Sequence, residues 1–136
     1  MKKIEVKAVI DRSPDLVWEC FTNPKHICNW NFASLDWYCP TAMSDLKPGG
    51  HFTYRMASRD GCMGFDFAGT FITVEREKHL CYKLGDDRQV DVVFSAEGES
   101  TLITETFAPE TLNDAEMQKA GWQAILNNFK NYCQSQ

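Results

Sequence analysis

The stretch that decides the fold is "YRMASRDGCMGFDFAGTF", Tyr54 to Phe71, in which aromatic and other apolar residues recur at two-residue spacing on both sides of a polar tripeptide. Such alternation is typical of half-buried β-strands. The tripeptide Arg59-Asp60-Gly61 is turn material, because Asp and Gly tolerate the backbone angles of tight turns. The stretch therefore predicts a β-hairpin. It leaves open whether Arg55 and Asp66 face the apolar side or solvent, since a bulge reverses a strand's facing.

More strands are expected on either side of this hairpin. Downstream, residues 79–84, 89–95 and 101–107 have the same character and are separated by short turns rich in Gly, Asp and Glu. Consecutive strands joined by short turns favour an antiparallel meander. Upstream, residues 2–10 alternate polar and apolar side chains, which predicts an edge strand. The segment 28–50 is rich in aromatic residues but has no clean period, so no strand is predicted there.

Helices are expected in two places. Ser13 as N-cap and Pro14 at the first helical position predict a short helix, and Asn23-Pro24 opens a second one. Asn113 followed by Glu116 resembles a capping box, and about 20 residues after it carry one apolar stripe at helical spacing. That stripe must be buried against the sheet. Because a single helix covers less width than a curved sheet, a concave apolar gap between them is expected, which is where small-molecule sites occur.

Five strings carry a resemblance to a known family: "SPDLVWECFTNPKHICNW" (13–30), "DLKPGGHFTYRM" (45–56), "GFDFAGTF" (64–71), "ETFAPE" (105–110) and "GWQAILNNFKNY" (121–132). They resemble the SRPBCC superfamily of START and birch-pollen-allergen-like proteins. Within it they look like the AHSA branch, named for the C-terminal domain of the heat-shock-protein-90 ATPase activator, in its stand-alone bacterial form.

The resemblance implies an α+β helix-grip fold over a single domain, residues 1–136. In this fold a curved antiparallel sheet of six to seven strands wraps around a long C-terminal helix, and two short helices follow the first strand. It also implies an internal hydrophobic cavity. Members of the superfamily use it to carry lipids, polyketides, hormones and flavonoids, and some have become cyclases or hydrolases.

The predicted partner is a small apolar or aromatic molecule held in that cavity. Glu105 faces the cavity if Ile103 and Phe107 do, by strand alternation; the opposite register would leave Glu105 in water. The predicted ligand-binding residues are Phe52, Tyr54, Met56, Phe67, Phe94, Glu105, Phe107, Trp122, Ile125 and Phe129. Trp30 and Trp37 are expected at the cavity mouth, unless they only seal the edge of the core.

Three classes of function follow from these residues. The leading hypothesis is a binding module without catalysis. A second is an enzyme of the cyclase or hydrolase kind that uses Glu105 as acid or base. A third is a protein-interaction module, either co-chaperone-like or a homodimer, that uses the exposed sheet face or the aromatic segment from Trp30 to Tyr38.

Composition narrows the classes further. The formal charge is −5 and the basic residues form no cluster, which disfavours nucleic-acid binding. No apolar run has the length of a signal peptide or a membrane span, so we expect a cytoplasmic protein without membrane partners. The 6 cysteines and 3 histidines are scattered without the spacing of metal ligands. No metal or other cofactor is therefore expected.

Overall fold

The computed structural model describes residues 3–136, so Lys2, where the first predicted strand begins, lies outside the described residues. Seven strands and three helices follow one another along this part of the chain. In chain order they are β1 (Ile4–Ile10), α1 (Pro14–Thr22), α2 (Pro24–Ile27), β2 (Trp37–Ser44), β3 (His51–Ser58), β4 (Gly64–Glu75), β5 (His79–Leu84), β6 (Gln89–Glu97), β7 (Ser100–Phe107) and α3 (Ala115–Gln134). Among the described residues, no helix is long and apolar enough to cross a membrane.

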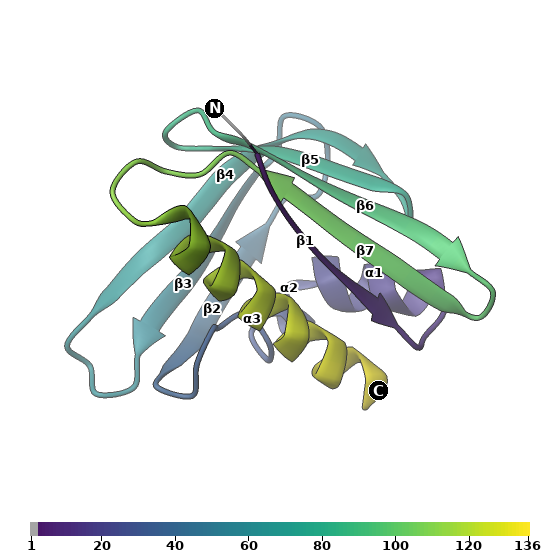
Figure 1. Ribbon diagram of the computed structural model, residues 1–136, viewed down its shortest axis with the longest axis horizontal. Coiled ribbons are helices and arrows are strands. Elements are labelled where there is room, and N and C mark those ends of the chain that lie inside the picture. Colours follow the sequence, from purple (N-terminus) through teal and green to yellow (C-terminus); the bar gives the residue numbers. More distant parts are fainter. Residues whose placement is uncertain (1–2) are drawn as a thin grey trace.

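The strands form one antiparallel sheet in the order β1-β7-β6-β5-β4-β3-β2. Strands β2 to β7 are a meander, and β1 joins it by pairing with the last strand, β7. The sheet curls, and α3 lies diagonally across its open side while α1 and α2 cover one end (Figure 1). The predicted α+β helix-grip architecture, with two short helices after the first strand, is confirmed.

Strand β7 shows the alternation that the sequence predicted. Its residues are alternately buried and half-buried along the whole strand, with Thr101, Ile103, Glu105 and Phe107 on the inner face. The pairing with β1 and β6 runs without a register shift along β7. Glu105 therefore faces inward, which decides between the two registers that the sequence left open.

The hairpin of β3 and β4 is also confirmed, and it answers the question about its two charged residues. Arg55 and Asp66 stand opposite each other in the register of the two strands. Both are exposed, and the Arg55 Nη1 lies 3.3 Å from the Asp66 Oδ1. They form an ion pair on the outer face of the sheet, where solvent keeps its net contribution to stability small.

Two details differ from the expectation. Strand β2 was not predicted, because Pro40 falls where the pairing with β3 shifts register between Tyr38 and Thr41 and interrupts the alternation. Helix α3 begins one residue later than the capping-box pattern indicated: its N-cap is Asp114, not Asn113. Asn113 instead donates to the Glu110 carboxylate from both its backbone and its side-chain nitrogen.

An aromatic cluster fills the end of the interior that α1 and α2 cover. We call it the packed end and define it by Trp18, Phe94 and Phe129, all of them buried. The Trp18 ring meets Phe94 edge-on at 5.3 Å. Phe21 and Trp30 stack on each other at 5.3 Å, and each touches Phe129. These two rings separate the packed end from the rest of the interior.

Candidate functional site

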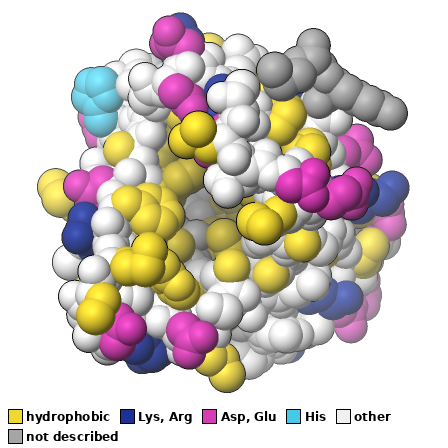
Figure 2. Space-filling view, turned by 60° about the vertical axis from the view of Figure 1, so that its left-hand side comes forward, with side chains coloured by type: hydrophobic (Ala, Val, Ile, Leu, Met, Phe, Trp, Pro, Cys, Tyr) yellow, Lys and Arg dark blue, Asp and Glu magenta, His cyan; other side chains and the backbone are white. Residues whose placement is uncertain are grey.

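A cavity of about 320 Å³ occupies the other end of the interior, which we call the hollow end. It lies between the inner face of β3, β4, β5 and β7 and the first half of α3. The cavity is hollowed into the face shown in Figure 2, where hydrophobic side chains gather around it. Its lining residues are Phe21, Thr22, Trp30, Asn31, Leu46, Phe52, Tyr54, Met56, Phe65, Phe67, Phe71, Leu80, Tyr82, Arg88, Glu105, Glu110, Asn113, Gln118, Trp122 and Ile125.

Aromatic rings make up most of the wall on the sheet side. Phe52 lies 4.9 Å from Tyr54 and 5.0 Å from Tyr82, centroid to centroid. Phe67 faces Trp122 of α3 across 6.1 Å in an edge-on arrangement. The rings come from β3, β4, β5 and α3, so the wall is built from regular elements and does not depend on a loop. A ligand would find a largely preformed apolar surface.

Trp122 closes the side of the cavity nearest to β7. Its indole stacks on Phe107 with centroids 4.0 Å apart and an angle of 17° between the planes. Phe107 is fully buried beneath it. The indole therefore covers Phe107 and presents its own other side to the cavity.

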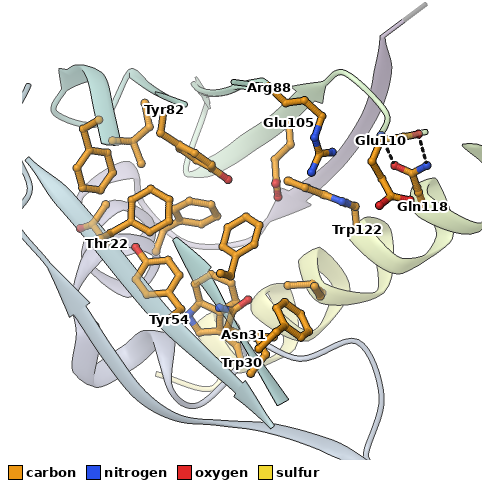
Figure 3. A pocket seen from close by; sticks show the side chains of 18 of the residues that line it. Thr22, Trp30, Asn31, Tyr54, Tyr82, Arg88, Glu105, Glu110, Gln118 and Trp122 are labelled. Carbon is orange, nitrogen blue, oxygen red and sulfur yellow. Dashed lines mark hydrogen bonds between the residues drawn. The ribbon is translucent and has the colours of Figure 1, made fainter. Parts of the chain in front are cut away.

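Glu105 is the buried ionisable group of the site. Its side chain points from β7 into the space between Tyr82, Arg88 and Trp122 (Figure 3). Only 7% of the residue is exposed, and its carboxyl group makes no hydrogen bond within residues 3–136. Burial raises the pKa of Glu105 to about 8, because desolvation disfavours the charged form. At neutral pH the carboxyl group is therefore mostly protonated.

Two neighbours of Glu105 have contrasting environments. The pKa of the Tyr82 hydroxyl is raised well above its ordinary value, first by burial and then by the charge of Glu105. Arg88 forms no ion pair with Glu105 and has other partners. Its Nε donates to the Asp86 Oδ2 at 2.6 Å, and its Nη1 donates to the Ala108 carbonyl oxygen at 3.2 Å. The positive charge at this side of the cavity is thus already paired with Asp86.

The mouth of the cavity is framed by a hydrogen-bonded loop between β7 and α3. The Glu110 backbone N–H donates to the Gln118 side-chain oxygen at 2.9 Å (Figure 3). The Gln118 side-chain nitrogen donates back to the Glu110 and Asn113 carbonyl oxygens. Phe65 of β4 also lines the cavity and is 51% exposed. One glutamine on the first turn of α3 therefore holds the loop that borders the opening.

Seven of the ten predicted ligand-binding residues line the cavity, and three do not. Phe52, Tyr54, Met56, Phe67, Glu105, Trp122 and Ile125 line it. Phe94 and Phe129 face inward as expected, but they belong to the packed end. Phe107 is covered by the Trp122 indole. Inward facing was inferred correctly for all three, while their position along the interior was not.

The two tryptophans expected at the cavity mouth lie elsewhere. Trp30 is buried in the wall, where its Nε1 donates to the Cys20 carbonyl oxygen at 3.0 Å. Trp37 begins β2 and packs against Phe65 at 5.9 Å without lining the cavity. The reason is the unpredicted strand β2, which carries Trp37 to the sheet edge. Of the large hydrophobic side chains in the segment Trp30–Tyr38, the structure leaves Leu35 and Tyr38 exposed.

Several residues that line the cavity were not predicted from the sequence. Leu80 and Tyr82 could have been found, because they alternate on β5 in the same way as the residues chosen on β3. Arg88, Glu110 and Gln118 could not, because they lie in loops or at a helix start, where no periodicity indicates the direction of a side chain. The residues at the mouth were therefore the part of the site that the sequence could not predict.

The lining has a restricted chemistry. The polar side chains that border the cavity carry carboxyl, phenol, indole, amide and guanidinium groups and the hydroxyl of Thr22, but none is His, Cys, Ser or Lys. Within residues 3–136, no three His, Cys, Asp or Glu residues gather closely enough to hold a metal ion. All six cysteines are free thiols.

A curled antiparallel sheet closed by a long C-terminal helix around a cavity defines the helix-grip proteins of the SRPBCC superfamily. Within that superfamily the chain belongs to the family described as activator of Hsp90 ATPase homolog 1-like protein, whose model matches residues 11–134. No curated protein matches the sequence.

Solved structures agree with this assignment. An AHSA1-like protein from Aeromonas hydrophila is 42% identical, with a TM-score of 0.93, over 98% of this chain and 93% of that one. A protein from Cytophaga hutchinsonii is 44% identical, with a TM-score of 0.85, over 98% and 92% of the two chains. A protein from Nitrosomonas europaea shares the fold at 19% identity, with a TM-score of 0.83 over 98% and 94%.

Proposed function

We propose that this protein binds a small hydrophobic or aromatic molecule in the cavity between the sheet and α3. The observation that carries the proposal is the cavity itself: about 320 Å³ walled by aromatic rings that regular elements hold in place. An unfilled apolar space of this size costs stability, because its lining loses packing contacts. A bound ligand would restore those contacts.

Binding is favoured over catalysis by the residues at the site. Glu105 has the raised pKa that an acid–base catalyst needs. However, acid–base catalysis of a cyclase or hydrolase kind also needs a nucleophile or a second proton-transfer group in place. No histidine, serine, cysteine or lysine lines the cavity, and the Thr22 hydroxyl, which does, donates to the Trp18 carbonyl oxygen. Burial raises the pKa values of the Tyr54 and Tyr82 phenols, which moves them away from the range useful for proton transfer at neutral pH. Glu105 is better suited to orient a ligand than to transform it.

The test is a thermal-shift screen with lipids and aromatic compounds, together with a variant that fills the cavity. A ligand that binds only the folded state raises the melting temperature. Ile125 lines the cavity from α3, so Ile125→Trp would place a large ring in the space that a ligand would use. We expect shifts for the wild type that disappear in Ile125→Trp.

The matched control is Ile72→Trp. Ile72 lies in β4 and is 44% exposed, and it does not line the cavity. The same change in side chain there should leave the ligand-induced shifts intact. If no compound of the panel shifts the wild type or quenches its tryptophan fluorescence, the proposed function is wrong. Equal loss of the shift in both variants would also contradict it, because binding would then not depend on the cavity.

A further inference from the structure

The cavity contains a buried acid with no counterpart in the protein. Residue Glu105 is more than nine-tenths buried, its side chain points into the cavity, and its carboxyl group makes no hydrogen bond within the described chain (Figure 3). Buried carboxyl groups are normally paired or hydrogen-bonded, because an unsatisfied one costs free energy. An unpaired group that faces an open cavity is therefore a place where a ligand would supply the missing partner.

The groups that face Glu105 do not supply that partner. Tyr82 of β5 and Tyr54 of β3 are neutral phenols whose pKa values burial raises. Trp122 of α3 carries an indole N–H and no charge. Arg88 is the only cationic side chain of the lining within residues 3–136, and its guanidinium is bound to Asp86 and to the Ala108 carbonyl. A second carboxylate, Glu110, lies at the mouth.

The remaining walls of the cavity also favour positive charge. The faces of aromatic rings carry negative electrostatic potential and attract organic cations, more strongly where water is excluded. Trp122 and Tyr82 border the space into which Glu105 points (Figure 3), and Phe67 contacts both of these rings. Aromatic faces combined with one unpaired carboxyl group are the features by which proteins hold amines.

We propose that the ligand of this cavity is a small arylalkylamine, an aromatic ring that carries an aminoalkyl chain. Its protonated amino group donates hydrogen bonds to the Glu105 carboxylate while its ring packs against the aromatic wall. The inference rests on the proposed function of small-molecule binding and names its ligand class. In the empty protein Glu105 is mostly protonated at neutral pH, so amine binding moves its proton to solvent. Charge-assisted hydrogen bonds of this kind are about twice as strong as neutral ones.

The experiment compares amines with neutral molecules of the same shape. Phenethylamine and tryptamine are titrated by calorimetry against phenethyl alcohol and tryptophol, which replace the amino group by a hydroxyl. We expect the amines to bind wild-type protein about tenfold more tightly or better. Amine affinity should also rise by up to about tenfold per unit as pH rises from about 6 to about 8, while Glu105 ionises. Alkylamines stay protonated over that range.

Two variants test whether Glu105 causes the preference for amines over alcohols. Glu105→Gln keeps the shape of the side chain and removes its charge, so the amines should lose their advantage over the alcohols and their pH dependence. Asp66→Asn removes a carboxylate from the outer face of the sheet and should leave both unchanged.

The outcomes separate this inference from the proposed function. Alcohols that bind as tightly as the amines would overturn the inference and leave small-molecule binding standing. The inference also fails if none of the four probes binds, or if Glu105→Gln keeps the amine preference. The proposed function fails as well only if the wider panel of lipids and aromatic compounds produces no thermal shift.

Discussion

The packed end and the hollow end lie under the same sheet and are lined by similar residues, yet one is filled and the other is open. At the packed end, α1 and the segment after α2 bring Trp18, Phe21 and Trp30 onto the rings of Phe94 and Phe129. At the hollow end only α3 covers the sheet, and the aromatic side chains stand around a space of about 320 Å³.

The difference teaches that aromatic content does not decide between core and pocket. What decides is how many elements cover each part of the curved sheet. Two layers of side chains meet where α1 and α3 both lie over the sheet, and their aromatic rings contact one another and Phe94. Where only α3 covers the sheet, the side chains of α3 and those of the inner sheet face stay apart and leave the cavity between them. Stability and binding capacity are therefore located in different parts of one interior.

The largest expected effect is that of Phe129→Ala at the packed end. Phe129 is fully buried and contacts both Phe21 and Trp30, so its removal leaves a hole that these rigid neighbours cannot fill. We expect a loss of about 3–5 kcal/mol in the free energy of unfolding, measured by urea denaturation. A loss below about 1.5 kcal/mol would mean that the packed end is not tightly packed and would remove the contrast between the two ends.

The next effect is a pH dependence that originates at the hollow end. Glu105 has a pKa of about 8 in the folded protein and an ordinary value of 4.5 in the unfolded chain. Between these values the folded state holds a proton that the unfolded state releases. The free energy of unfolding should therefore fall as pH rises from 4.5 to about 8, by on the order of 4 kcal/mol from this group.

Comparing the wild type with Glu105→Gln isolates this contribution, because every other titrating group is common to both proteins. Urea denaturation at a series of pH values should show the two stabilities diverging across that range, with the variant the more stable at high pH. Parallel curves would show that Glu105 is solvated, which would contradict its place in the cavity wall.

The smallest effect on stability is expected for Phe67→Ala at the hollow end. Phe67 is half-buried and borders the cavity, so truncation enlarges an existing space instead of opening a new one. We expect a loss of about 1–2 kcal/mol in the free energy of unfolding, together with weaker ligand-induced thermal shifts. If Phe67→Ala destabilises the protein as much as Phe129→Ala, the two ends are energetically alike and the comparison does not hold.

Most of the fold could be predicted from the sequence, because period-two alternation and turn residues are local signals. They located the hairpin of β3 and β4, and they put Ile103, Glu105 and Phe107 on one face of a strand without deciding which face is buried. Strand β2 was missed where Pro40 interrupts the local signal and pairing with β3 takes over. Tertiary pairing of this kind is not visible in the residues of the segment itself.

The sequence could predict which residues face the interior, but not which end of the interior they occupy. Alternation tells which side of a strand a residue faces, and so Tyr54 and Phe94 were treated alike. Phe94 is packed and Tyr54 lines the cavity, because α1 lies over Phe94 and not over Tyr54. The residues at the mouth could not be predicted for another reason. Gln118 and Glu110 are brought together by hydrogen bonds in a loop, and such bonds leave no periodic pattern in the sequence.

The raised pKa of Glu105 also changes how the electrical charge of this protein should be counted. The formal charge of −5 treats every carboxyl group as ionised at pH 7. In the folded protein Glu105 is mostly protonated at that pH, so the native molecule is about one unit less negative than its composition implies. Electrophoretic mobility therefore carries information about the cavity, since a neutral ligand that ionises Glu105 restores the charge that folding removed, whereas a bound ammonium group cancels it.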